Sequence, residues 1–289
     1  MALVFVGATS PAALAVESRE EMTIAPTDKH YSVNPGETIT DNFTILNSGD
    51  VPYDFTTYAA PYSVSDTVYN ADSTTQGNRS DAFRWIQFDK TSFHAEVRES
   101  VKVPFTIRVS PFATPGGHYG IIFAEQKLAT KAEGTGVTRT IRMGMVIYVN
   151  VKGNAKTEGS LGKSSIAWYQ PSAPITGEIL VNNTGETDFQ AKASFVVSDL
   201  FGNVKYTQKF NELYVLPGSP RLISFNWDKS PWLGIFKVQM GVSFLDTTKV
   251  TESYVFVLPR WLLFVGGIVI LLGAIRAVRA LSNRPSKRR

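Results

Sequence analysis

The sequence predicts an all-β protein that ends in one membrane-spanning helix. Three observations lead to this fold class. Apolar and polar residues alternate with period two in many stretches, turn residues separate these stretches, and an unbroken apolar run follows near the C-terminus. Period-two alternation gives a strand one buried and one solvated face, which is typical of antiparallel sheets.

The first segment, residues 1–15, has the features of a signal peptide. Ala2 to Ala15 is apolar and small, and Ala13-Leu14-Ala15 has the A-x-A form that signal peptidases read. Charged residues begin at Glu17, and we expect cleavage before Val16. The segment lacks the usual Lys or Arg near Met1, so either the true start lies upstream or the signal is weak.

Two stretches of about domain size are expected to form tandem Ig-like β-sandwiches, over residues 22–151 and 161–258. Clear alternation occurs at 101–109, 189–197 and 236–244. Many short strands separated by Asn, Gly and Pro turns are typical of a sandwich. Residues 152–160 are rich in Gly and small side chains, so they are expected to form the linker between the domains.

The two expected domains share a sequence pattern. Asn47-Ser48-Gly49 is followed by Tyr53, and Asn183-Thr184-Gly185 is followed at the same spacing by Phe189. Further along, Gly117-His118-Tyr119 matches Gly234-Ile235-Phe236. We expect each Asn-x-Gly turn to close a hairpin, and each later Gly to let the chain bend into an alternating strand. The pattern therefore predicts two copies of one module.

Two polar stretches interrupt the first domain. Ser63–Asp81 has no capacity to form a core and is expected to be a long surface loop, a type of segment that often carries function. Thr130–Thr138 is expected to cap a hairpin between the strands Ile121–Gln126 and Arg139–Val151.

The C-terminal apolar run predicts a transmembrane helix over residues 259–281. The uncharged part, Trp261 to Ile275, is about 22 Å long as a helix, which is short of a hydrocarbon layer about 30 Å thick. Flanking residues complete the span because Arg260 and Arg276 can extend their aliphatic stems toward the headgroups.

The charges around this helix predict its orientation. Trp261 is expected at the outer interface, and Arg276 and Arg279 precede a basic tail over residues 282–289. Cationic residues mark the cytoplasmic side, so the N-terminal domains are expected outside the cell and the C-terminus inside. The expected location is the cell membrane, crossed once.

Charge and cysteine content narrow the class of protein. The cations from Arg276 onward exceed the total charge of +4, so the remainder of the chain is mildly acidic and a nucleic-acid partner is not expected. The chain has no cysteine, which excludes disulfides, a thiol nucleophile and a cysteine zinc site. An exported domain without disulfides suggests a bacterial surface protein stabilised by core packing alone.

Several motifs of the first domain resemble one known family. They are a Trp-led strand, an alternating strand, a Pro-Gly-Gly-x-Tyr turn and two earlier turns: Trp85-Ile86-Gln87-Phe88, Ser100–Val109, Pro115–Tyr119, Pro35-Gly36-Glu37 and Asn47-Ser48-Gly49. Together they resemble the peptidoglycan-binding domain of the WxL-interacting proteins of Gram-positive surfaces. The order of signal peptide, two β domains, membrane helix and basic tail is also similar.

This resemblance implies peptidoglycan and WxL-type surface proteins as partners, with adhesion or surface-complex assembly as the outcome. It covers residues 22–151 and weakens over 157–258. In that family the second domain is assigned to host binding, and no residues of this chain match there.

Four residues form the candidate binding surface. His118 and Tyr119 follow the Pro-Gly-Gly turn and are expected to form a small exposed patch, although the turn itself has a structural explanation. Tyr69 and Asp72 lie in the polar insert. Trp85 and Trp168 are expected in the core or between the sheets, with ligand stacking as the alternative.

The sequence predicts no enzyme, no cofactor and no metal site. Its three histidines form no metal-binding motif. Paired carboxylates occur at Glu96/Glu99 and at Asp66/Asp72, and the simplest interpretation of both pairs is a solvated loop.

The predicted function is therefore a membrane-anchored surface protein that binds wall peptidoglycan, surface proteins or both. Recognition would use loops and the exposed edges of sheets. The alternative is a chaperone-like or assembly subunit of a surface or pilus structure.

Overall fold

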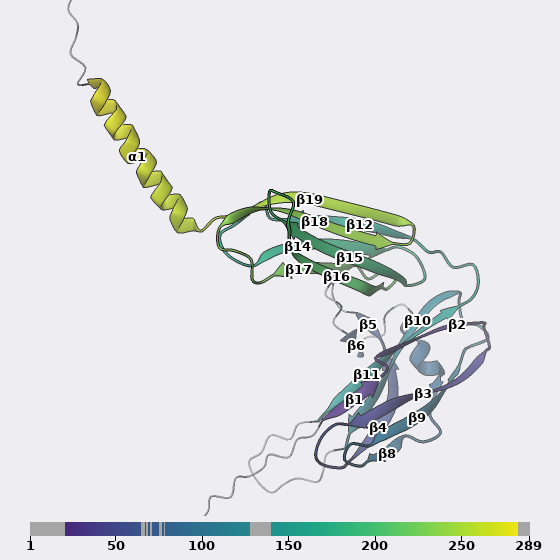
Figure 1. Cartoon of the computed structure of the whole chain (residues 1–289). Coiled ribbons are helices and arrows are strands. Elements are labelled where there is room, and N and C mark those ends of the chain that lie inside the picture. The colour runs from purple at the N-terminus through teal and green to yellow at the C-terminus, as the bar shows by residue number, and fades with distance from the viewer. Residues whose placement is uncertain are drawn as a thin grey trace, which may run out of the picture. The chain divides into compact units, whose positions relative to one another are not determined.

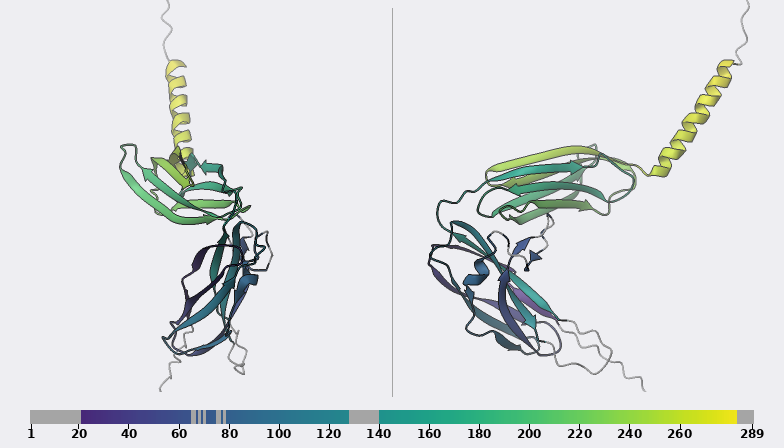
Figure 2. Two further views of the ribbon diagram at one scale, coloured as in Figure 1. Left: turned by 90° about the vertical axis from the view of Figure 1, so that its right-hand side faces the viewer. Right: turned by 180° about the vertical axis from the view of Figure 1, so that it is seen from behind.

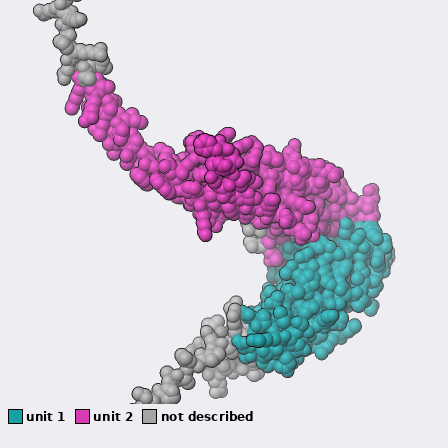
Figure 3. All heavy atoms as spheres, in the orientation of Figure 1, with its two compact units in different colours: residues 1–63, 73–114, 118–152 teal, residues 64–72, 115–117, 153–289 magenta. Residues whose placement is uncertain are grey.

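The computed structural model describes residues 21–282 except 65, 66, 68, 70, 75, 76, 78 and 128–139 (Figure 1). The expected signal peptide, Asp66, the hairpin cap at Thr130–Thr138 and the basic tail beyond residue 282 lie outside the described residues. The chain forms two compact units (Figure 3). Unit 1 comprises Met1–Ser63, Ser73–Thr114 and His118–Lys152, and unit 2 comprises Val64–Asp72, Pro115–Gly117 and Gly153–Arg289.

Unit 1 is a sandwich of two β-sheets. One sheet has the order β1 (Met22–Ala25), β3 (Thr38–Asn47), β9 (Ser100–Arg108), β7 (Ile86–Gln87). The other has the order β2 (Asp28–Val33), β11 (Arg142–Val151), β10 (Gly116–Gln126), β4 (Tyr53–Pro61), β8 (Ser92–Ala95). A short 3-10 helix, η1 (Ala82–Trp85), precedes β7.

Unit 2 contains a second sandwich of the same kind. One sheet has the order β12 (Gly159–Ile166), β14 (Ile175–Asn183), β17 (Arg221–Trp227). The other has the order β13 (Tyr169–Gln170), β19 (Thr247–Val257), β18 (Gly234–Phe244), β15 (Phe189–Ser198), β16 (Val204–Val215). Figure 2 gives two further views of these layers.

The first strand is divided in both sandwiches. In unit 1, β1 pairs antiparallel with β3, and β2 then crosses to the other sheet and pairs parallel with β11. In unit 2, β12 pairs antiparallel with β14, and β13 then pairs parallel with β19. A first strand divided between both sheets confirms the prediction of two Ig-like modules.

The predicted alternation accounts for both cores. Val103, Phe105 and Ile107 are buried in unit 1, and Phe195 and Met240 are buried in unit 2, each flanked by more exposed residues. Fully burying such a side chain contributes about 1.5–3 kcal/mol, so apolar packing can hold each sandwich together without a disulfide.

The Asn-x-Gly turns connect two sheets, so the expectation that each closes a hairpin is wrong. β3 and β4 lie in opposite sheets of unit 1, as β14 and β15 do in unit 2. Asn47 is fully buried; its Nδ2 donates to the carbonyls of Val51 (2.8 Å) and Ala95 (3.3 Å), and its Oδ1 accepts from the amide of Gly49 (3.0 Å). The side chain therefore satisfies the backbone of the turn that crosses between the sheets.

Asn183 makes the same three contacts in unit 2. Its Nδ2 donates to the carbonyls of Thr187 (2.8 Å) and Val215 (2.7 Å), and its Oδ1 accepts from the amide of Gly185 (2.9 Å). This agreement between the two turns supports the prediction of an internal repeat.

Part of the polar insert is packed within unit 2, so the expectation of an unpacked surface loop is wrong for this part. The Tyr69 hydroxyl donates to the Ser219 carbonyl (2.8 Å) and accepts from the amide of Leu216 (2.7 Å). The Arg221 guanidinium lies 4.4 Å from the centre of the Tyr69 ring. The insert also contains the short strands β5 (Ser63–Val64) and β6 (Ala71–Asp72).

The C-terminal helix α1 (Arg260–Ser282) has 23 residues, one position displaced from the expected range. At 1.5 Å per residue it is about 34 Å long, enough to cross a hydrocarbon layer about 30 Å thick. The part from Arg260 to Arg279 is apolar, and none of it is buried in the protein.

We predict that Asn183→Ala destabilises the second sandwich by about 2–4 kcal/mol, because two buried carbonyls and one amide lose their partner. Equilibrium urea unfolding of the detergent-solubilised chain measures the change. The matched control is Asn182→Ala, since Asn182 is half-buried beside it and its side chain makes no hydrogen bond within the part of the chain that the structure describes. Equal midpoints for the two variants would contradict the role given to Asn183.

Candidate functional site

The outer edge of β19 is the candidate binding site. β13 pairs with β19 only at Phe256 and Val257. From Thr247 to Val255, β19 therefore has no backbone-paired strand on this side among the described residues. The Thr251 hydroxyl lies 3.3 Å from the Ser164 hydroxyl of β12, which belongs to the other sheet. An edge of this kind presents unpaired N–H and C=O groups that can accept another strand.

The register fixes which backbone groups of β19 point outward. The Phe256 amide donates to the Trp168 carbonyl in the crossing segment (2.7 Å), so it points away from β18. In an antiparallel pair these directions alternate along the strand, so Thr248, Val250, Glu252 and Tyr254 also present their N–H and C=O groups outward. The candidate site is thus a row of four outward-facing residues.

The side chains beside this edge combine apolar and paired polar groups. Val250 and Tyr254 are 60% and 54% exposed. Between them, the Glu252 carboxylate accepts from Lys237 Nζ (2.9 Å) and from the Gln239 amide. The hydrogen bond from Lys237 is the largest cause that lowers the pKa of Glu252. Because the charges are paired, this surface suits a peptide with alternating apolar side chains better than a strongly charged ligand.

The opposite edges of the same sandwich are occupied by side chains. The amide of Asn226 in β17 donates to Gln208 Oε1 (3.1 Å), and the Tyr206 hydroxyl donates to the Asn226 carbonyl (3.0 Å). Arg221 Nη1 donates to the Tyr214 carbonyl in β16 (2.6 Å). These bonds occupy part of the outward backbone of β16 and β17, so β19 offers the more accessible edge.

The predicted patch at His118 and Tyr119 is wrong, because both side chains are 3% exposed. They lie on β10, the middle strand of its sheet, and nearly every residue of this strand is buried. His118 Nδ1 lies 2.6 Å from Asp81 Oδ1, and His118 Nε2 lies 2.8 Å from the Thr114 carbonyl. Both ring nitrogens lie within hydrogen-bond distance of an oxygen, so these contacts hold the ring inside the fold.

The contact with His118 changes the pKa of Asp81. Burial raises the pKa of its carboxyl group, but the hydrogen bond and charge of His118 outweigh burial, and the net pKa is lowered. His118 is therefore part of the folded interior of unit 1, together with Trp85, whose ring centre lies 4.8 Å from the His118 ring.

The two tryptophans expected in the core differ in their positions. Trp85 is buried in the core of unit 1, as expected. Trp168 is 70% exposed, so the expectation is wrong for this residue. It lies where the chain crosses from β12 to β13, outside both layers. The proposed ligand contacts at Tyr69 and Asp72 stay a prediction, and the hydroxyl of Tyr69 is engaged in packing.

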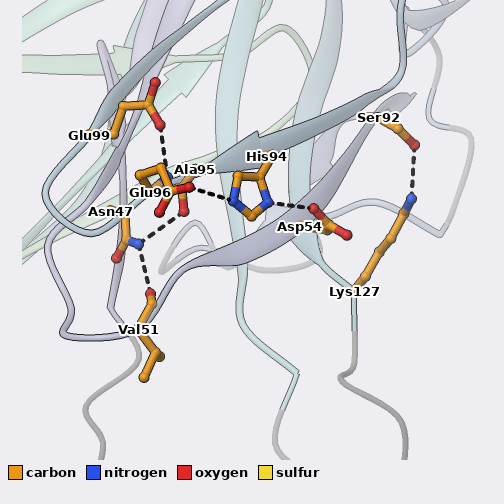
Figure 4. A network of polar contacts seen from close by, with 9 residues as sticks. All are labelled: Asn47, Val51, Asp54, Ser92, His94, Ala95, Glu96, Glu99 and Lys127. Carbon is orange, nitrogen blue, oxygen red and sulfur yellow. Dashed lines mark hydrogen bonds and ion pairs between the residues drawn. The ribbon is translucent and has the colours of Figure 1, made fainter.

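The acidic pair Glu96/Glu99 holds a turn (Figure 4). Glu99 Oε2 accepts from the backbone amide of Glu96 (2.7 Å). The ring of His94 lies between Asp54 Oδ1 (2.8 Å) and Glu96 Oε1 (3.4 Å). The hydrogen bond that His94 donates to the Asp54 carboxylate is the largest cause that raises the pKa of His94. Within the described ranges, no group of three or more His, Cys, Asp or Glu residues could hold a metal ion.

Comparisons with known proteins return solved structures of fimbrial chaperones. No family model and no curated protein matches the sequence. The class 5 fimbriae chaperone CfaA is 10% identical with a TM-score of 0.42, covering 81% of this chain and 99% of that chain. A structure of the Salmonella enterica SafA pilin with the SafB chaperone gives 10% identity and a TM-score of 0.41, covering 82% of this chain and 96% of that chain.

The chaperone–tip complex CsuC–CsuE of Acinetobacter baumannii gives 13% identity and a TM-score of 0.40, covering 81% of this chain and 98% of that chain. Identities and TM-scores of this size do not show the function of this chain, which therefore has to follow from its own geometry.

We predict that Asp54→Asn lowers the pKa of His94, because the main acceptor for its protonated ring loses its charge. In the native chain the folded pKa lies above the ordinary value of 6.5. The contact therefore stabilises the fold fully below pH 6.5, and its contribution is lost as pH rises through the folded pKa. NMR titration of the imidazole protons measures the pKa, with Asp89→Asn as the control for an exposed acid. An unchanged His94 titration in Asp54→Asn would exclude this assignment.

Proposed function

We propose that this chain is a membrane-anchored binding protein of the bacterial cell surface that holds an extended segment of an exported protein against β19. The observation that carries this proposal is the open edge from Thr247 to Val255, on a strand that leads directly toward α1. No reaction and no cofactor are assigned to the chain.

α1 and its flanking charges support the membrane anchor. The helix is apolar, long enough to cross a bilayer, and unburied from Arg260 to Arg279. Arg276 and Arg279 lie at its C-terminal end, which fits the cytoplasmic side by the distribution of cations around membrane helices. In this topology both sandwiches lie outside the cytoplasm, where they can contact exported proteins.

The outward backbone groups of β19 support this binding mode. An added strand would pair with the outward groups of Thr248, Val250, Glu252 and Tyr254, and each hydrogen bond contributes about 0.5–1.5 kcal/mol. The exposed Val250 and Tyr254 side chains lie on alternate positions and can contact alternate side chains of the added strand. This mode suits both an adhesion complex and a chaperone-like role in assembly, which differ in whether the bound segment is later released.

Peptidoglycan and WxL-type proteins stay as partners implied by the sequence resemblance of the first domain. A surface protein fits the open edge better than a glycan, because the edge offers a ladder of backbone groups and a paired, neutral surface.

We predict that Val250→Pro abolishes partner binding while the sandwich stays folded. Proline removes an outward N–H and leaves the bonds to β18 intact. A photo-cross-linking residue at Lys249, in the full chain in its own cells, is expected to form an adduct with an exported polypeptide. Val250→Pro should lose this adduct, whereas Val250→Thr, which keeps the N–H, should retain it.

A second measurement distinguishes binding at the β19 edge from binding to a cell-wall glycan. The full-length chain is incubated with isolated cell-wall sacculi, and both Val250 variants are compared after their thermal midpoints confirm folding. Retention on sacculi in both variants, without any adduct at Lys249, would contradict the edge-binding proposal and support a wall glycan as the partner.

A further inference from the structure

Six exposed apolar side chains gather at one end of the second sandwich. We call them the apolar end patch: Trp168, Leu200, Phe201, Trp232, Leu233 and Phe256. Phe201 is 90% exposed and Trp232 is 61% exposed, although large aromatic side chains are usually buried in a soluble domain.

The strand register brings these residues to the same end. Gly234 pairs with Val257, so the loop that carries Trp232 and Leu233 lies beside the end of β19. Ser198 pairs with Lys237, which places the turn after β15, with Leu200 and Phe201, at this end as well. Trp168 precedes the pair Tyr169–Phe256 and completes the patch.

A rigid turn presents Leu200 and Phe201. The Asp199 carboxylate accepts from the backbone amides of Phe201 and Asn203, both at 2.9 Å, and Gly202 has a φ of +85°. Lys205 pairs with the same carboxylate at 3.0 Å. Within the turn the polar groups therefore satisfy one another, and the apolar side chains project outward.

The opposite end of the sandwich differs in character. Leu245 is the large exposed apolar side chain in the described turn between β18 and β19. The turn between β14 and β15 carries Thr184, Glu186 and Asp188. The concentration of aromatic side chains is therefore specific to the end from which α1 departs.

The chain holds this end close to the start of α1. Only Leu258 and Pro259 lie between β19 and α1. Leu258 is fixed on the sandwich, since its amide donates to the Gln170 carbonyl (3.1 Å) and its carbonyl accepts from the Tyr169 hydroxyl (2.9 Å). Two residues span at most about 7 Å, which is about the thickness of one headgroup layer.

We infer that the apolar end patch inserts into the outer headgroup layer of the membrane that α1 crosses. The occupant is the lipid bilayer, because a spanning α1 leaves the end of β19, beside which the patch gathers, within about a headgroup layer of the hydrocarbon, and Trp side chains favour that depth. The contact seats the second sandwich on the membrane surface. This inference rests on the proposed anchor and does not depend on the partner at β19.

Single spin labels test the inference in the full chain. Because the protein has no cysteine, Phe201→Cys, Trp232→Cys, Leu245→Cys and Ile268→Cys each introduce one unique labelling site. The labelled chains are placed in phosphatidylcholine nanodiscs, and their collision rates with oxygen and with a water-soluble nickel complex are compared. We expect the oxygen-to-nickel ratio at positions 201 and 232 to exceed that at 245 several-fold and to stay below that at 268, as befits the headgroup layer.

The control positions separate the ways in which the inference can fail. Equal ratios at 201, 232 and 245, with a lipid-exposed label at 268, would overturn the inference and leave the anchor intact. A label at 268 that is not exposed to lipid would overturn both the anchor and the inference. Labels at 201 and 232 that are shielded from both reagents would show a protein cover, such as a second copy, and would also overturn it.

Discussion

A buried asparagine at the crossing between two sheets is the constraint on which each sandwich depends. Asn47 and Asn183 are both buried, and each binds its own turn and the end of a neighbouring strand. Apolar packing is not directional, so it does not by itself specify how the chain passes from one layer to the other. The chain has no cysteine, so no disulfide fixes this crossing. The directional hydrogen bonds of the asparagine amide fix it instead, at the start of the second sheet of each sandwich.

Much of the fold follows from local patterns in the sequence. The alternation at 101–109, 189–197 and 236–244 predicts strands because each has one buried face, and the helix follows from a single apolar run. The Asn-x-Gly repeat predicts two related modules. It does not predict that the turns cross between sheets, since turn chemistry is local and the partner of each strand depends on residues far along the chain.

The candidate site depends on this non-local information. Whether β19 has a neighbour is decided by how soon the first strand of its module crosses between the sheets, which no local pattern states. The same reason explains His118 and Trp168, because burial depends on which strand is central and where the chain crosses. The exposed Val250 and Tyr254 lie at even positions of β19, and the buried Val255 and Val257 lie at odd positions. This alternation is a local signal of an exposed strand face.

β19 is both the open edge and the strand that continues toward α1, with mechanical consequences for a bound partner. A partner pulled along the direction of β19 would load its hydrogen bonds in shear, so that many bonds share the force and none opens first. The tension would then pass along one continuous stretch of backbone toward α1. With the proposed partner bound, the strand that binds it would also be the strand that carries the load to the membrane helix.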